Sequence, residues 1–109
     1  MAVPKYYVLV NHVPHPVSLK AWVAVAATRR PTEDPWRVAF TDLTDTCYVS
    51  TVFLGTNHRF LGKGPPLLFE SMVFGGPTHG EMRRYSTWDD AEIGHQAMVA
   101  RARKEIANA

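Results

Sequence analysis

Three ionisable residues are candidates for chemistry because of where the sequence places them. His58 lies in a long glycine-rich stretch, Glu70 is the one charge in an apolar segment, and His95 is the one ionisable residue in an apolar helical stripe. A carboxylate and an imidazole that lie close together shift each other's pKa and can act as general acid and base. A small hydrolase or metal-dependent enzyme built on these three residues is therefore one hypothesis.

The same residues have a purely structural interpretation. A carboxylate inside an apolar strand is costly unless it is paired, so we expect Glu70 to pair with His58 or Arg84, or to hold the 55–66 loop through backbone amides. His95 would then donate one hydrogen bond in the core. We expect these four residues to form a buried polar network, we assign no catalytic residue, and we expect the chain to be non-enzymatic.

Metal and cofactor sites are not expected. The five histidines and the single cysteine, Cys47, show none of the spacings of zinc sites, and one cysteine excludes an internal disulfide. The glycine-rich run 62–66 lacks the Gly-Lys-Ser/Thr ending of a phosphate-binding loop and leads into a strand. Cys47 is expected to be a small core residue.

A protein-binding surface is the hypothesis that we favour. Phe60 and Leu61 lie in the middle of the 55–66 loop, where an exposed aromatic residue often marks a contact. The alternative is that the loop folds back and buries Phe60 over the end of the sheet. With Arg59 in the same loop and His79 in the neighbouring 75–81 turn, these residues are the predicted protein-binding candidates.

Nucleic-acid binding is a weaker alternative. Arg29, Arg30, Arg83 and Arg84 could form a basic patch if the fold brought them together, with Trp36 or Phe60 available for stacking. The chain, however, has 12 Lys and Arg against 10 Asp and Glu, a net charge of +2. Each half of the chain carries a net charge of +1, because residues 1–50 have five basic and four acidic side chains and residues 51–109 have seven and six. Neither half therefore has the excess of positive charge that is typical of a nucleic-acid-binding surface.

The elements that would position these residues follow from apolar periodicity. Runs rich in β-branched and aromatic residues predict five strands, at 6–10, 36–43, 47–54, 67–74 and 82–85. The segment 47–54 has apolar residues on both faces, which indicates a central strand, and 82–85 is expected to be a short outer strand. Two prolines in 11–16 predict a turn or an extended edge there.

Two helices are predicted. Ser18 is a suitable N-cap for a short helix within 18–28. A longer C-terminal helix begins after Ser86 or Thr87, and its acidic start and basic end match the helix dipole. Apolar residues and one histidine recur on one face of this second helix at spacings of three and four: Trp88, Ala91, His95, Met98, Val99, Ala102 and Ile106.

These elements predict a single α+β domain covering 1–109. Four or five mostly antiparallel strands would form a small sheet packed against the long C-terminal helix, with the short helix beside them. No apolar run reaches about 18 residues and the N-terminus lacks signal-peptide features, so we expect a soluble, cytoplasmic protein. Short exposed sheet edges could pair between copies, which makes a homodimer plausible.

Three blocks of the sequence resemble a family of small uncharacterised proteins from tailed bacteriophages and prophages. The blocks are Val-Ser-Thr-Val-Phe-Leu-Gly (49–55), Gly-Pro-Pro-Leu-Leu-Phe-Glu-Ser-Met-Val-Phe-Gly (64–75) and Arg-Tyr-Ser-Thr-Trp-Asp-Asp-Ala-Glu-Ile-Gly-His (84–95). They lie within the region 49–98, which spans about half of the chain, and the region 29–46 matches less well. Family members often have Leu-Asp-His where this chain has Thr56-Asn57-His58, so no acidic role is expected at Asn57. They also tend to have Glu-Thr-Met where this chain has Glu70-Ser71-Met72.

The resemblance implies a viral origin and synthesis in the cytoplasm of a bacterial host, and it implies no activity, substrate or cofactor. Together with the residue patterns it leads us to expect a phage accessory protein that binds a host or phage protein, in host takeover or counter-defence.

Overall fold

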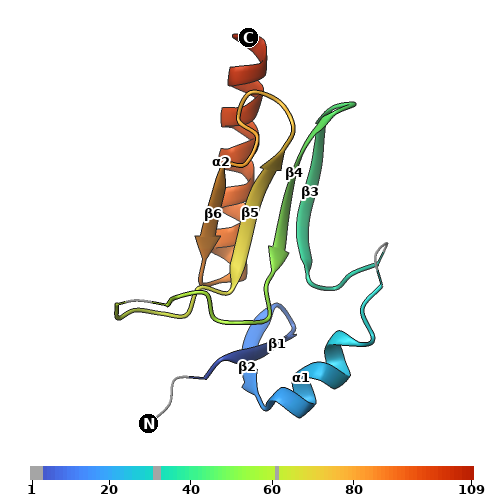
Figure 1. The fold of residues 1–109 in the computed structure, drawn as a ribbon, viewed down its shortest axis with the longest axis vertical. Helices are drawn as coiled ribbons and strands as arrows, with labels where there is room; N and C mark the ends of the chain where they lie inside the picture. The colour runs from blue at the N-terminus through green and yellow to red at the C-terminus, as the bar shows by residue number, and fades with distance from the viewer. Residues whose placement is uncertain (1–3, 31–32, 61) are drawn as a thin grey trace.

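A four-stranded antiparallel sheet with one long helix across one face forms the larger part of the molecule (Figure 1). The computed structural model describes residues 4–30, 33–60 and 62–109. The sheet has the strand order β3-β4-β5-β6, and its strands are β3 (Arg37–Thr44), β4 (Cys47–Phe53), β5 (Phe69–Phe74) and β6 (Met82–Tyr85). The helix is α2 (Trp88–Ala107). The predicted α+β class is confirmed, as are the inner position of β4 and the outer position of β6.

The two inner strands alternate strictly between buried and half-buried residues. Successive side chains of a strand point to opposite faces, so every second residue of β4 and β5 lies under α2. Thr51 of β4 lies opposite Ser71 of β5, which fixes the register of the pair. On the other face, Phe40, Tyr48 and Phe74 stack across three strands, with ring centroids 5.0 and 4.8 Å apart.

Helix α2 forms where the charges and apolar residues predict it. The side chain of Thr87 caps its first turn by accepting a hydrogen bond from the Asp90 backbone amide at 3.1 Å. The residues it buries against the sheet belong to the predicted stripe: Ala91, His95, Met98, Val99 and Ala102. Gly94 lies within the helix, and the ring of Tyr85 packs directly against it. A Cβ atom at position 94 would come within 2.2 Å of this ring, so only glycine fits without a shift.

The N-terminal segment forms a separate hairpin. β1 (Tyr6–Val10) pairs with β2 (Val13–Val17) through a turn in which Asn11 and His12 both have positive φ, as a type I′ turn requires. β2 is thus the extended edge that the prolines predicted. Proline has no N–H to donate to a neighbouring strand. Pro14 and Pro16 are therefore tolerated in an edge strand, where their nitrogen atoms can face away from β1. The other edge of β1 contacts the main chain of the 55–66 loop, where the Tyr7 amide donates to the Gly55 carbonyl at 2.9 Å.

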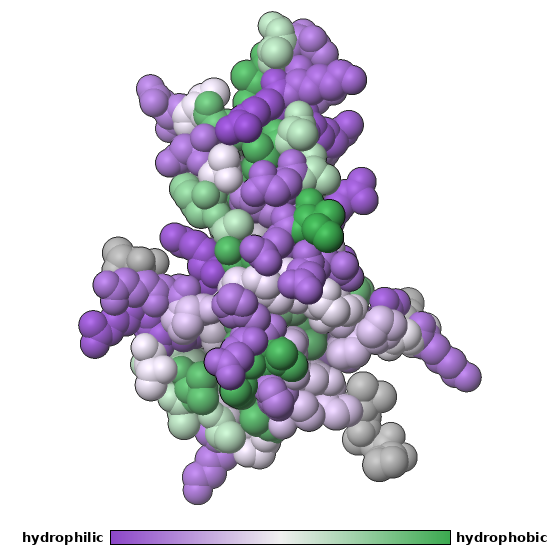
Figure 2. All heavy atoms as spheres, turned by 180° about the vertical axis from the view of Figure 1, so that it is seen from behind, coloured by the Kyte–Doolittle hydropathy of each residue, from purple (hydrophilic) through white to green (hydrophobic). Residues whose placement is uncertain are grey.

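Helix α1 (Leu19–Ala26) packs at the base of the molecule beside the hairpin, with Ser18 as its N-cap as predicted. Trp22 and Ala26 pack against the core, and the ring of Trp22 lies 5.8 Å from Tyr6 and 6.1 Å from Trp36. No residue of α1 is fully buried, and Leu19 and Val23 are each 52% exposed. Seen from behind, apolar atoms gather on this lower part, whereas the upper part is mainly hydrophilic (Figure 2).

The fold is elongated, with extents of 49 × 33 × 20 Å and a radius of gyration of 15.1 Å. The expected value for a compact chain of this length is about 13 Å. The hairpin and α1 lie at one end of the sheet and do not cover its second face, which accounts for the length (Figure 1). Within the described part of the chain, no helix has the length and apolar character needed to cross a membrane.

Candidate functional site

The loop between β4 and β5 projects from the side of the molecule (Figure 1), and Asn57 makes hydrogen bonds near its base. The side-chain oxygen of Asn57 accepts hydrogen bonds from the backbone amides of Arg59 at 2.9 Å and Leu67 at 3.2 Å. The backbone amide of Asn57 donates to the backbone carbonyl of Lys5 at 3.0 Å, and the backbone amide of His58 donates to the backbone carbonyl of Leu67 at 2.9 Å. The loop is therefore braced at both ends and tied to the start of β1.

Phe60 stands at the tip of this braced loop with 76% of its surface exposed. The alternative that the loop buries this ring over the sheet is therefore wrong. Leu61, the second apolar candidate, lies outside the described residues.

A groove beside Phe60 is lined by three basic residues, Lys5, Arg59 and Lys63. Its other lining residues are Pro4, Asn57, Gly62 and Gly64, so no carboxylate lines the groove among the residues that the structure describes. The Arg59 Nε atom donates to the Pro65 carbonyl at 2.8 Å, which fixes the guanidinium. Gly64 has φ of +149°, and a Cβ atom there would lie 3.1 Å from the guanidinium carbon. We call this site, made of Lys5, Arg59, Phe60 and Lys63, the Phe60 groove.

Glu70 pairs with Arg84, one of its two predicted partners. The Arg84 Nε atom donates to Glu70 Oε2 at 3.1 Å, between residues that face each other on β5 and β6. His58 instead shares a hydrogen bond with the Thr56 hydroxyl at 3.0 Å. Partial burial lowers the pKa of His58 and the nearby Arg84 charge lowers it further, while the Glu70 charge opposes both.

His95 belongs to a different cluster, on the opposite face of the sheet. It is fully buried between α2 and the sheet, and its Nδ1 and Nε2 atoms share hydrogen bonds with the hydroxyls of Thr51 at 2.6 Å and Thr41 at 2.8 Å. Thr51 also shares a hydrogen bond with Ser71. Burial lowers the pKa of His95, so its neutral form is favoured.

This cluster forms a polar layer across the helix–sheet interface, between two apolar clusters. One cluster, which includes Phe53, Phe69 and Ala91, lies on the side of the hairpin. The other, which includes Val49, Val73 and Val99, lies on the side of the β3–β4 turn. We call Thr41, Thr51, Ser71 and His95 the polar layer.

The predicted network of His58, Glu70, Arg84 and His95 does not form: Glu70 pairs with Arg84, whereas His58 and His95 each have other hydrogen-bond partners. Phe69 and Ser71 are buried under α2, and side chains alternate along a strand, so Glu70 points to the sheet face opposite to that of His95. The acid–base hypothesis required one pocket shared by His58, Glu70 and His95, and the structure does not form it. In the same described part of the chain, no three metal-ligating side chains come together.

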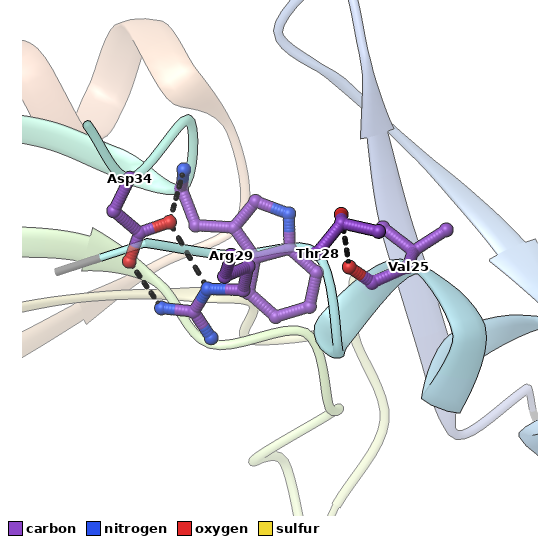
Figure 3. Close-up of polar contacts among 5 residues, drawn as sticks. Val25, Thr28, Arg29 and Asp34 are labelled. Atoms are coloured by element: carbon purple, nitrogen blue, oxygen red, sulfur yellow. Dashed lines mark hydrogen bonds and ion pairs between the residues drawn. The ribbon is translucent and has the colours of Figure 1, made fainter.

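The four arginines proposed for nucleic acid also fail to form one patch. Arg29 lies over the ring of Trp36 at 4.2 Å and forms an ion pair with Asp34, whose side chain also accepts a hydrogen bond from the Trp36 amide at 2.9 Å (Figure 3). The hydrogen bonds from Arg29 lower the pKa of the Asp34 carboxyl. Arg83 and Arg84 are successive residues of β6, so they point to opposite faces of the sheet. Arg30 is exposed beyond the end of α1.

His79 lies far from the Phe60 groove. The 75–81 turn follows β5 and the 55–66 loop precedes it, so the two lie at opposite ends of the strand (Figure 1). The Gly75 amide donates to His79 Nδ1 at 2.8 Å, which gives His79 a role in bracing its own turn. Cys47 is buried, as expected, and its Sγ atom lies 3.3 Å from the Gly75 carbonyl oxygen.

Sequence reasoning missed two residues of the site. The first is Asn57, which braces the loop. Asparagine side chains often hydrogen-bond to nearby backbone groups in turns, so an asparagine at the start of the loop could have indicated this role. Lys5 joins the groove through a backbone contact between distant parts of the chain, which no local pattern reveals. Comparison of the chain with protein-family models, with curated proteins and with solved structures finds no match.

Proposed function

We propose that this chain is a non-enzymatic accessory protein of a tailed bacteriophage or prophage that binds a host or phage protein through the Phe60 groove. The three sequence blocks that resemble phage proteins support the origin, and with it action in the cytoplasm of a bacterial host. Host takeover or counter-defence is the role that such an origin favours.

The observation that carries this proposal is an exposed aromatic ring on a braced loop. Phe60 is 76% exposed, although the loop that presents it is held by hydrogen bonds at Asn57 and Arg59. Phenylalanine and arginine are both enriched in protein interfaces, and arginine is enriched among the residues that contribute most binding energy. A loop that is already ordered loses little conformational entropy on binding, so its contacts contribute more fully to affinity.

Affinity capture with the full chain as bait tests the proposal in lysates of bacterial cells, with and without phage infection. We expect a specific protein to be retained by the native chain and lost with Phe60→Ala. Ile93→Ala is the matched control, because Ile93 is 70% exposed but lies on α2. If Phe60→Ala and Ile93→Ala retain the same proteins as the native chain, the Phe60 groove is not the binding site.

We also propose that two copies associate through the outer edges of the main sheet, since β3 and β6 each have only one neighbouring strand. Light scattering after size exclusion would then give about twice the chain mass of 12.2 kDa. A mass of one chain at all concentrations would contradict the dimer.

A further inference from the structure

The positive charge of the Phe60 groove is local and unbalanced. Three cations from two distant parts of the chain, Lys5, Arg59 and Lys63, line it, and the described lining residues include no carboxylate. Arg84, on β6 of the sheet, is already paired with Glu70. The net charge of the whole chain is only +2, so the groove has far more positive charge than the average surface.

The guanidinium of Arg59 is oriented by a hydrogen bond within its own loop. Its Nε atom donates to the Pro65 carbonyl, and no described residue accepts a hydrogen bond from its two terminal amino groups. A guanidinium held in this way matches the two oxygen atoms of a carboxylate. Gly62 and Gly64 add no side chains to this wall, which leaves room for a backbone to approach.

We infer that the partner segment recognised by the Phe60 groove is an acidic peptide stretch with an apolar or aromatic side chain among its carboxylates. Its carboxylates pair with Arg59, Lys5 and Lys63, and its apolar side chain packs on the ring of Phe60. This inference rests on the proposed function and specifies the chemistry of the partner.

A polynucleotide fits the molecule less well than an acidic peptide. Nucleic acid gains affinity from a track of many phosphate contacts. Here Arg29 and Arg84 are paired with carboxylates, and Arg83 projects from the helix side of β6, so these three arginines do not extend the groove into a basic track. Single-strand binding also uses successive aromatic platforms, whereas Phe60 is the one aromatic residue among the described lining residues.

Fluorescence polarisation with the full chain and a labelled peptide, Glu-Glu-Phe-Glu-Glu-Trp-Glu, tests the inference. We expect saturable binding that weakens by about tenfold or more between about 50 and 500 mM salt, because exposed charge pairs are screened. The charge-reversed variants Lys5→Glu and Lys63→Glu should each weaken binding by about tenfold. Lys20→Glu is the matched control on α1 and should bind as the native chain does.

Three outcomes would overturn the inference. They are an unsaturable peptide signal, equal binding of a peptide with every Glu replaced by Lys, or tighter binding of a single-stranded oligothymidylate than of the acidic peptide. The affinity capture from lysates distinguishes failure of the acidic-peptide inference from failure of the proposed function. A partner lost with Phe60→Ala but retained by Lys5→Glu and Lys63→Glu would leave the function standing and remove the acidic specificity.

Discussion

At the scale of single residues, Thr51 is the central member of the polar layer. Its hydroxyl contacts both Ser71 and His95, and all three residues are fully buried. In water these groups would hydrogen-bond to solvent, so a buried group that loses its partner is left with an uncompensated desolvation cost. Removal of one member of the polar layer should therefore lower the free energy of unfolding by more than the net contribution of one hydrogen bond.

Thr51→Val keeps the shape of the side chain and removes the hydroxyl. We expect it to lower the free energy of unfolding by about 1–3 kcal/mol, since it leaves Ser71 and one nitrogen atom of His95 unpaired. Thr51→Ser keeps the hydroxyl and should cost clearly less than Thr51→Val. Urea denaturation of both variants measures the difference, and equal losses would show that packing, not hydrogen bonding, explains the role of Thr51.

The buried His95 also makes the stability depend on pH. Burial lowers its pKa in the folded state, whereas in the unfolded chain the pKa stays near about 6.5. Above this value the histidine is neutral in both states and the full stability is present. As the pH falls below it, the unfolded chain binds a proton that the folded chain resists, so the free energy of unfolding decreases, by at most about 1.4 kcal/mol per pH unit.

Urea denaturation between pH 8 and pH 5 measures this loss, which we expect to begin near pH about 6.5. The pKa of His58 is also lowered, so this residue adds to the same slope. His95→Gln should therefore flatten the profile in part, and His58→Gln should remove a further share. A slope unchanged in His95→Gln would contradict the assignment.

The sequence predicted residue roles unevenly. Glu70 was expected to have a partner because a lone charge in an apolar strand is costly, and Arg84 is that partner. The sequence could not show that Glu70 and His95 face opposite sides of the sheet, because this depends on which strand face α2 covers. It also could not place Lys5 beside Arg59, since a backbone contact across about half of the chain joins them.

At the scale of elements, α2 and β6 are fitted to each other at Gly94. Glycine in a helix interior costs about 0.5–1 kcal/mol relative to alanine, so on helix propensity alone Gly94→Ala would be stabilising. The Tyr85 ring reverses this expectation, because an added Cβ atom would come within 2.2 Å of it. Such overpacking costs about 1–3 kcal/mol.

We therefore expect Gly94→Ala to lower the melting temperature in the native background. In a Tyr85→Ala background the ring is absent, and the same substitution should be neutral or stabilising. Thermal unfolding of the two single variants and the double variant gives the coupling between the sites. Equal effects of Gly94→Ala in both backgrounds would rule out the steric explanation.

Most elements could be predicted from local patterns, but the partners of β1 could not. Runs of β-branched and aromatic residues predicted β4 and β5, and the capping residue with terminal charges predicted α2. The sequence 6–10 also predicted a strand, yet nothing in it distinguishes pairing with the sheet from pairing with 13–17. That choice follows from the turn at Asn11 and His12, whose positive φ angles close a tight hairpin.

At the scale of the whole molecule, the average charge hides where charge is concentrated. The net charge of +2 argued against a basic surface, and each half of the chain is nearly balanced. The fold pairs Arg29, Arg84 and Arg101 with carboxylates and leaves Lys5, Arg59 and Lys63 together at the Phe60 groove. Composition could exclude a highly basic protein, but it could not locate a small basic groove formed by tertiary contacts.

The polar layer has a consequence for how the interior opens. It interrupts the apolar contacts between α2 and the sheet, so the two apolar clusters on either side have no continuous packing through it. Proteins open locally in contiguous cooperative units that differ in stability, and we expect each apolar cluster to belong to its own unit. Native-state hydrogen exchange should therefore show two protection levels along β4, β5 and α2, with the change near Thr51, Ser71 and His95. Substituting all three by apolar residues of similar volume should merge the two levels into a single cooperative unit.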